Sequence, residues 1–262
     1  MENPRFYGES PYGVAVIHGG PGAPGSIAPV AREISTTCGV LEPLQTEHTL
    51  DGQVEELKEI LEKYANLPVV LIGWSHGATL SCLFSASYPS LVWKLIIIGT
   101  VPLEQNIAAR VGDDRLLRLS EEDRAEVLSL EEFIWDSVEE DKSPSMARLF
   151  GLFTKAESYD LLPCEDEVIK YQLDINISVG LDARRLLASG KLPEIMRGIK
   201  CPVTAIQGDF DLRPADSIRE SLSHILNDFK FILFEKCGHY PWYERYARET
   251  FYAILKEEII ND

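Results

Sequence analysis

Short, almost wholly apolar runs recur along the chain. Clear examples cover residues 12–18, 69–72 and 93–98. A strand with so little polar alternation is buried on both faces, which is typical of a parallel sheet covered by helices. Between the runs, apolar residues follow helical spacing, most clearly from Asp51 to Tyr64, where Asp51 is the expected N-cap. The alternation predicts a doubly wound α/β domain with right-handed crossovers.

The alternation is interrupted in the middle of the chain. Expected strands lie at residues 12–18, 39–44, 69–72, 93–100, 201–208 and 230–235, and expected helices flank them at 28–36, 51–64, 78–88, 215–226 and 243–259. From Leu103 to Ser189 only helical patterns occur, at 116–128, 144–157 (with Ser143 as cap) and 165–188. We therefore expect an α/β core formed by residues 1–102 and 190–262. Residues 103–189 are expected to form an all-helical cap over the C-terminal edge of the sheet, where such folds bind ligands.

The run at 69–72 leads directly into Gly73-Trp74-Ser75-His76-Gly77 and then into a helical pattern. A strand that turns abruptly into a helix strains the residue at the turn, and it brings the residues two before and two after close together, so glycine fits there. The turn lifts the Ser75 hydroxyl clear of the sheet. The helix beside it aims backbone N–H groups at the same spot. The pattern predicts a nucleophile next to an anion site.

A serine nucleophile needs a base, and the base needs an orienting partner. His239 follows an expected strand and a glycine, so its loop can reach the edge of the sheet where Ser75 lies. His18, at the end of the first strand, is expected to hold the glycine-rich turn after it. Two acids follow the strand that ends at Gly208. We prefer Asp211 as the orienting acid and expect Asp209 to form the turn by bonding its own backbone.

Four motifs together resemble the α/β-hydrolase superfamily, and they occur in that family's order. They are His18-Gly19-Gly20-Pro21-Gly22, Gly73-Trp74-Ser75-His76-Gly77, Gly208-Asp209-Phe210-Asp211 and Gly238-His239. The first resembles the proline iminopeptidase branch in particular. The resemblance implies a hydrolase with Ser75 as nucleophile, His239 as general base and acid, and Asp211 as orienter. It also implies an oxyanion hole made by the backbone N–H groups of Gly20 and His76, with no cofactor and no metal.

The sequence departs from the family pattern in three places. Only about a dozen residues precede the first buried strand, so the N-terminal strands usual in the family are expected to be reduced or absent. His76 stands where the peptidase branch has tryptophan, and its side chain is expected to point toward the pocket or the cap. The cap carboxylates by which such peptidases hold a substrate's amino group match no particular residues here.

Charge and composition narrow the class of partner. The 262 residues carry a net charge of -17, which disfavours nucleic acid and anionic membrane. Residues 103–189 hold 20 acids and 10 Lys or Arg, which marks either a preference for amine-bearing substrates or solvated helix faces. No apolar run approaches the ~20 residues of a membrane span. Five scattered cysteines without a C-x-x-C spacing and an N-terminus without a signal-peptide pattern indicate a cytoplasmic protein.

Three functional interpretations remain open from the sequence. The first is a serine hydrolase that cleaves a small ester or amide through an acyl-enzyme, with proline iminopeptidase activity as its sharper version. The second is a carbon–carbon lyase or hydrolase that uses the same triad. The third is a ligand-binding protein that keeps the fold. Haloalkane dehalogenases and epoxide hydrolases are disfavoured because they carry aspartate where this chain has Ser75. The sequence indicates no oligomeric state.

Overall fold

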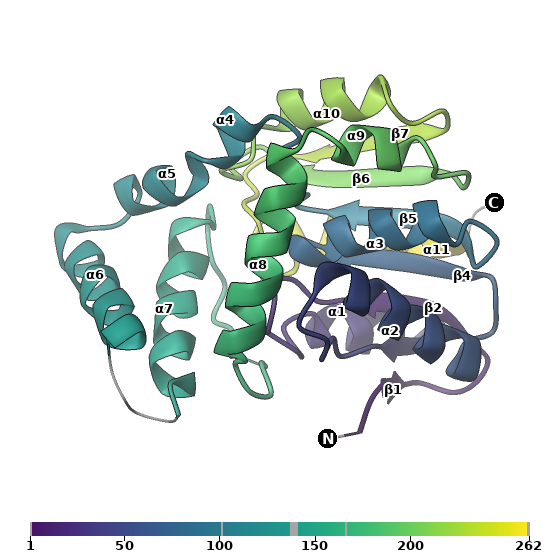
Figure 1. Ribbon diagram of the computed structural model, residues 1–262, viewed down its shortest axis with the longest axis horizontal. Helices are drawn as coiled ribbons and strands as arrows, with labels where there is room; N and C mark the ends of the chain where they lie inside the picture. The colour runs from purple at the N-terminus through teal and green to yellow at the C-terminus, as the bar shows by residue number, and fades with distance from the viewer. Residues whose placement is uncertain (1, 101, 137–140, 166, 261–262) are drawn as a thin grey trace.

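The computed structural model describes residues 2–100, 102–136, 141–165 and 167–260. Within them a seven-stranded sheet runs in the order β1-β3-β2-β4-β5-β6-β7 (Figure 1). The strands are β1 (Arg5–Tyr7), β2 (Tyr12–Ile17), β3 (Gly39–Glu42), β4 (Val69–Trp74), β5 (Val92–Ile98), β6 (Val203–Gly208) and β7 (Phe229–Phe234). Only β1 pairs in the antiparallel sense, with β3. The expected mostly parallel sheet is confirmed, and its N-terminal part is reduced to one strand of 3 residues.

Helices cover both faces of the sheet. They are α1 (Ala28–Ile34), α2 (Leu50–Tyr64), α3 (His76–Ser87), α9 (Leu192–Met196), α10 (Ala215–Ser223) and α11 (Arg248–Ile260). In β4, Val69 and Leu71 face the apolar cluster that includes α2, α3, α9 and α10. Val70 and Ile72 face the other cluster, with α1 and α11. All six residues of β4 are buried, which is why the run has no polar alternation.

Two expected helix starts are wrong by one or two residues. Helix α2 begins at Leu50, and its N-cap is Thr49, whose hydroxyl accepts a hydrogen bond from the Gly52 N–H at 3.0 Å. Leu50 is itself buried, so the apolar face of the helix extends one residue beyond the expected cap at Asp51. Ser143, the other expected cap, is the first residue of its helix and follows Lys142.

Residues 103–189, the proposed cap, hold α4 (Gln105–Ala108), α5 (Val111–Leu117), α6 (Glu121–Asp136), α7 (Ser143–Ala156) and α8 (Leu173–Ala188). Figure 1 shows α6 and α7 standing away from the sheet, with α8 between them and the core. A third apolar cluster, which includes Val127, Leu149 and Leu152, joins α6 to α7. Helix α8 instead buries Ile175 and Val179 in the core cluster. The expected long helix from 165 is shorter and starts at Leu173, and residue 166 lies outside the described residues.

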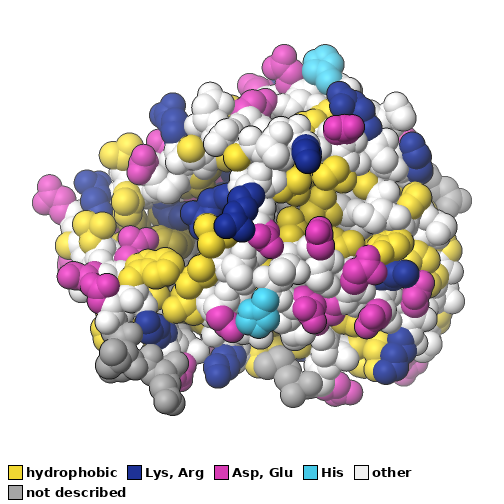
Figure 2. Space-filling view, viewed as in Figure 1, with side chains coloured by type: hydrophobic (Ala, Val, Ile, Leu, Met, Phe, Trp, Pro, Cys, Tyr) yellow, Lys and Arg dark blue, Asp and Glu magenta, His cyan; other side chains and the backbone are white. Residues whose placement is uncertain are grey.

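No helix among the described residues is both long and apolar enough to cross a bilayer. Acidic side chains are scattered over the face shown in Figure 2 and are interspersed with Lys and Arg. This distribution fits the interpretation of the negative charge as solvated helix faces.

Candidate active site

The turn between β4 and α3 has the strained geometry that the glycine pattern predicts. Ser75 has φ 55° and ψ −118°, a region that residues with a side chain rarely adopt. A Cβ atom on Gly73 would lie 2.3 Å from the carbonyl oxygen of Gly77. A Cβ atom on Gly77 would lie 2.3 Å from the carbonyl oxygen of Ile17. The two glycines therefore allow the chain to pass itself and the end of β2, with Ser75 at the start of α3.

The glycine-rich loop after β2 lies beside this turn. Gly20 has φ 42° and lines the same cavity as Ser75. His18 is buried, and its Nδ1 lies 2.9 Å from the carbonyl oxygen of Gly19, so it holds the loop as expected. The side chain of His76 does not line the cavity. It is buried under α2, with Nε2 3.5 Å from Oε1 of Gln53, so its expected direction is wrong because α2 covers that side of α3.

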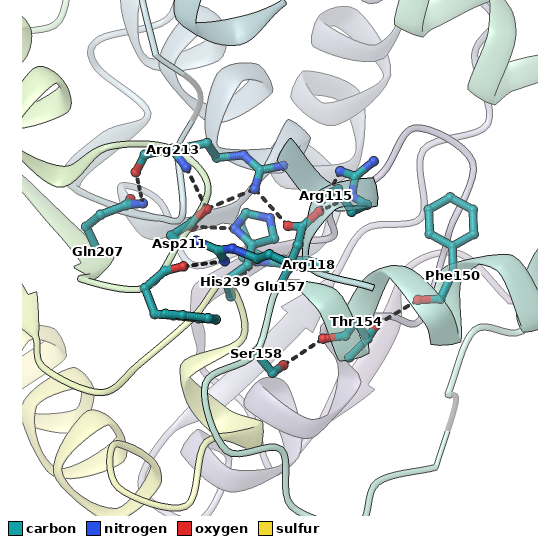
Figure 3. A network of polar contacts seen from close by, with 12 residues as sticks. Arg115, Arg118, Phe150, Thr154, Glu157, Ser158, Gln207, Asp211, Arg213 and His239 are labelled. Carbon is teal, nitrogen blue, oxygen red and sulfur yellow. Dashed lines mark hydrogen bonds and ion pairs between the residues drawn. The ribbon is translucent and has the colours of Figure 1, made fainter. Parts of the chain in front are cut away.

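The loops after β6 and β7 bring a carboxylate and an imidazole together (Figure 3). His239 Nδ1 lies 2.7 Å from Asp211 Oδ2, and both side chains are buried. Asp209 is exposed, and its Oδ1 accepts a hydrogen bond from the backbone N–H of Cys237 rather than from its own segment. Of the two acids that sequence analysis weighed, Asp211 is the one in contact with His239.

Gly99 makes room for this histidine, and sequence reasoning missed it. Its φ is 55°, and a Cβ atom there would lie 2.6 Å from His239 Nδ1. The available signal was a glycine directly after the buried strand β5, at the same edge of the sheet as Ser75. The histidine is also fixed from the turn between β4 and α3, because the Trp74 indole N–H donates to the carbonyl oxygen of His239 at 3.0 Å.

Ser75 and His239 line one cavity of about 590 Å³ between the core and the proposed cap. Its core side is formed by Gly19, Gly20 and Pro21 of the glycine-rich loop, and its cap side carries Phe150 and Phe153 of α7. From the sequence, the roles of Trp135, Phe150, Phe153 and Tyr159 are open, and packing inside the cap is the favoured expectation for these aromatics. Trp135 and Tyr159 are instead exposed, at 63% and 46%.

A buried network of charged groups continues from Asp211 into the proposed cap, and sequence reasoning missed its other members, Arg213, Glu157 and Arg115. Arg213 Nη1 lies 2.9 Å from Asp211 Oδ1 and 2.8 Å from Glu157 Oε2 (Figure 3). Arg115 of α5 pairs with the other oxygen of Glu157 at 2.5 Å. Burial alone would raise the pKa of Glu157, but the two arginines outweigh it and lower the pKa to about 2. Burial alone would also raise the pKa of Asp211. The neighbouring His239 and Arg213 outweigh it and hold the pKa of Asp211 below its usual range.

The model of the alpha/beta hydrolase fold family matches residues 21–246. The chain belongs to the alpha/beta hydrolase fold family. Similar solved structures include proline iminopeptidase of Mycobacterium smegmatis, at 17% identity and TM-score 0.61, covering 98% of this chain and 93% of that one. A meta-cleavage product hydrolase of Pseudomonas fluorescens gives 14% identity and TM-score 0.62, with 98% and 93% covered. Est816, described as an N-acyl homoserine lactone degrading enzyme, gives 13% and 0.66, with 97% and 95% covered. At these identities the likeness shows the fold alone. No curated protein matches the chain.

In this alpha/beta hydrolase the loop that carries His239 is fastened to the segment after α7. The Glu244 carboxylate is fully buried and accepts three backbone N–H groups, from Gly238 at 2.7 Å, Tyr159 at 2.7 Å and Asp160 at 2.8 Å. The backbone N–H of His239 donates to the carbonyl oxygen of Glu157 at 2.8 Å. The position of the imidazole therefore depends on the return of the chain from the cap.

Glu157, Asp211 and His239 also form the kind of cluster that can hold a cation, since one ligand atom of each lies within 4.8 Å of the others. Arg213 binds both carboxylates, and His239 binds Asp211. The guanidinium groups of Arg213 and Arg115, the latter paired with Glu157, thus already balance the two negative charges at this point. The arrangement fits an ion-pair network that fixes a histidine.

Two buried histidines are expected to make the protein less stable in mild acid. Burial lowers the pKa of His18 to about 4, and burial with the nearby His18 lowers that of His76 to about 3. The unfolded chain binds protons at these sites near pH 6.5 and the folded chain does not, so stability falls as pH drops below about 6.5. Each site contributes a slope of up to ~1.4 kcal/mol per pH unit. Thermal unfolding between pH 7 and 5 measures this slope.

Matched variants test the origin of the slope. His76→Asn should flatten the fall in Tm between pH 7 and 5, whereas His224→Gln, at an exposed position, should keep the wild-type slope. An unchanged slope in the His76 variant would contradict the interpretation.

Proposed function

We propose that the chain is a serine hydrolase that cleaves a small ester or amide through an acyl-enzyme. One observation carries the proposal: Ser75 at its strained turn and His239 bonded to Asp211 line a single cavity. His239 Nδ1 donates to Asp211, which leaves Nε2 to take the proton of the Ser75 hydroxyl as it attacks a carbonyl carbon. The same imidazole then protonates the leaving group. Water, activated in the same way, releases the acyl group.

The oxyanion hole in this proposal consists of the backbone N–H groups of Gly20 and His76. His76 is the first residue of α3, so its N–H has no partner within the helix and lies at the positive end of the helix dipole. General base catalysis contributes a factor of ~10²–10⁴, and each oxyanion donor contributes ~10²–10³. All of these parts belong to the core rather than to the cap.

The lining of the cavity favours an uncharged acyl group over a free amino terminus. Phe150 stacks on Tyr171 with ring centroids 5.1 Å apart, and both line the cavity. Holding an ammonium group would require an available carboxylate. Two of the carboxylates that line the cavity are already paired, Glu157 with two arginines and Glu167 with Arg32, whereas Glu165 lines it as an exposed side chain. This supports an esterase or amidase more than a proline iminopeptidase. A volume of about 590 Å³ suits a small-molecule substrate.

A fluorophosphonate probe and a substrate panel test the proposal. The wild-type protein should be labelled covalently, and it should hydrolyse short p-nitrophenyl esters faster than Pro-p-nitroanilide. A protein that is folded but not labelled would favour the ligand-binding alternative. Faster cleavage of the Pro-anilide would favour the peptidase version and overturn the argument from the paired carboxylates.

We also propose a cytoplasmic location, with no nucleic acid or membrane partner. No disulfide joins any of the five cysteines, all of which lie in the described residues. The net charge of -17 would repel both polyanionic partners.

A further inference from the structure

We propose that Arg213 and Glu157 are positioning residues that set the protonation equilibrium of His239 in opposite directions, so that a residue of the proposed cap acts on the base of the triad. The inference rests on the proposed function. It goes further by assigning a role to a residue contributed by the cap. The network in Figure 3 joins α5, the end of α7 and the loops after β6 and β7.

Arg213 fixes the orientation of Asp211. Asp211 Oδ1 accepts hydrogen bonds from the backbone N–H of Arg213 at 3.0 Å and from its Nη1 at 2.9 Å. These two bonds hold the carboxylate so that its other oxygen, Oδ2, faces His239 Nδ1. The backbone of Arg213 is held as well, because the Gln207 side chain donates through Nε2 to the carbonyl oxygen of Arg213 at 3.0 Å.

Glu157 contacts both Arg213 and His239. Its carboxylate receives Arg213 Nη1 at 2.8 Å, and its backbone carbonyl oxygen accepts the N–H of His239 at 2.8 Å. Glu157 follows the last residue of α7, so the cap supplies both contacts. Its side chain is only 2% exposed, and a buried carboxylate in such a place requires the two arginines that flank it.

Charged groups reach His239 from several elements packed around it, and the buried Glu244 carboxylate on its own loop accepts the neighbouring Gly238 N–H. Asp211 and Arg213 come from the loop after β6, Glu157 from the end of α7, and Arg115 and Arg118 from α5 and its end. The neighbouring rings of Tyr240 and Trp74 are uncharged, with centroids 5.3 Å from the imidazole. The carboxylates favour the imidazolium, and the arginines disfavour it.

Charge removal at the two sites therefore has opposite consequences. Arg213→Gln removes a positive charge and should move the titration midpoint of His239 to higher pH by about 0.5–1 unit. Glu157→Gln removes a negative charge, keeps the backbone carbonyl, and should move the midpoint to lower pH by a similar amount. The acidic limb of the pH dependence of kcat/KM should move with the midpoint in each variant.

The midpoint can be measured without turnover. In protein labelled with ¹³C-histidine, the His239 ring signal is identified by its loss in His239→Asn and followed by NMR from pH 4.5 to 9. The double variant Arg213→Gln/Glu157→Gln should return the midpoint close to the wild-type value. Arg213→Lys keeps the charge and loses the fork geometry, so its midpoint should stay while kcat falls by about 10-fold or more.

Two controls separate this role from general destabilisation. Arg219→Gln and Asp123→Asn each break an ion pair elsewhere, with Asp216 and Lys155, and should leave the midpoint unchanged. Shifts in the same direction in both single variants, or no shift in either, would overturn the inference. If Arg213→Gln does not fold, Glu157→Gln still decides, because its midpoint must fall. If the wild-type protein has no esterase activity, the proposed function is refuted. The NMR titration would still show whether Arg213 and Glu157 shift the protonation of His239.

Discussion

Replacing Ser75 with alanine is expected to lower kcat for ester hydrolysis by about 10⁵–10⁶ and to abolish fluorophosphonate labelling. The reason is that the remaining base and oxyanion donors have no nucleophile to activate. Their contribution alone leaves a residual ~10³–10⁴ over the reaction in water. Steady-state kinetics on a p-nitrophenyl ester measures the loss.

The same variant should remain folded, which makes the result interpretable. The Ser75 side chain makes no capping hydrogen bond to α3, so removal of the hydroxyl costs the helix nothing at its start. Alanine and serine both carry a Cβ atom, so the strain at φ 55° is the same in both. Ser87→Ala, at the exposed last residue of α3, is the matched control and should keep wild-type kinetics. A Ser75 variant that retains more than about a tenth of the wild-type kcat would overturn the assignment, since loss of a nucleophile is far costlier.

The features predictable from the sequence are those fixed by local sterics. A strand that enters a helix within one residue requires glycines two positions away on each side, and Gly73 and Gly77 show why, since neither has room for a Cβ atom. The buried strands could be predicted as well, because a parallel strand covered on both faces has no polar alternation. The fold and the position of Ser75 follow from these constraints.

The residues that sequence reasoning missed depend on contacts between distant segments. Arg213 follows a turn and Glu157 ends a helix, two positions where charged side chains are usually solvated. Their pairing joins residues 56 apart. Glu244 was missed for the same reason. Its buried carboxylate accepts hydrogen bonds from the backbone N–H of Tyr159, in the segment after α7, and of Gly238, in its own loop. No spacing rule within one element could reveal such partners.

The predicted direction of the His76 side chain was wrong because the direction in which a helical side chain points changes with every residue. His76 directly follows Ser75, so proximity in sequence suggested that its side chain faces the cavity. One residue corresponds to about 100° around a helix. The side chain is turned under α2 instead, against Gln53. The backbone N–H of His76 lies at the turn between β4 and α3, and the proposed oxyanion role needs only that group.

Asp211→Asn is expected to lower kcat/KM for the ester by about 10⁴, whereas Asp209→Asn should stay within a few-fold of wild type. In the Asp211 variant, the amide can donate to His239 Nδ1, which leaves the proton on Nε2 and removes the base proposed for Ser75. The asparagine oxygen can still accept from Arg213, so the loop should keep its shape. Asp209 is exposed and accepts the Cys237 N–H, which an asparagine oxygen also accepts.

The pair of variants isolates chemistry from folding because both substitutions are isosteric and lie in the same loop. Thermal unfolding at pH 7 should rank Asp209→Asn close to wild type. Asp211→Asn should be moderately less stable, since Arg213 loses one of its two carboxylate partners in a buried site. The kinetic loss should exceed what partial unfolding explains, and it should appear in kcat at temperatures well below Tm. If Asp209→Asn proved the more damaging change, the acid that orients His239 would have to be reassigned despite its 2.7 Å contact with Asp211.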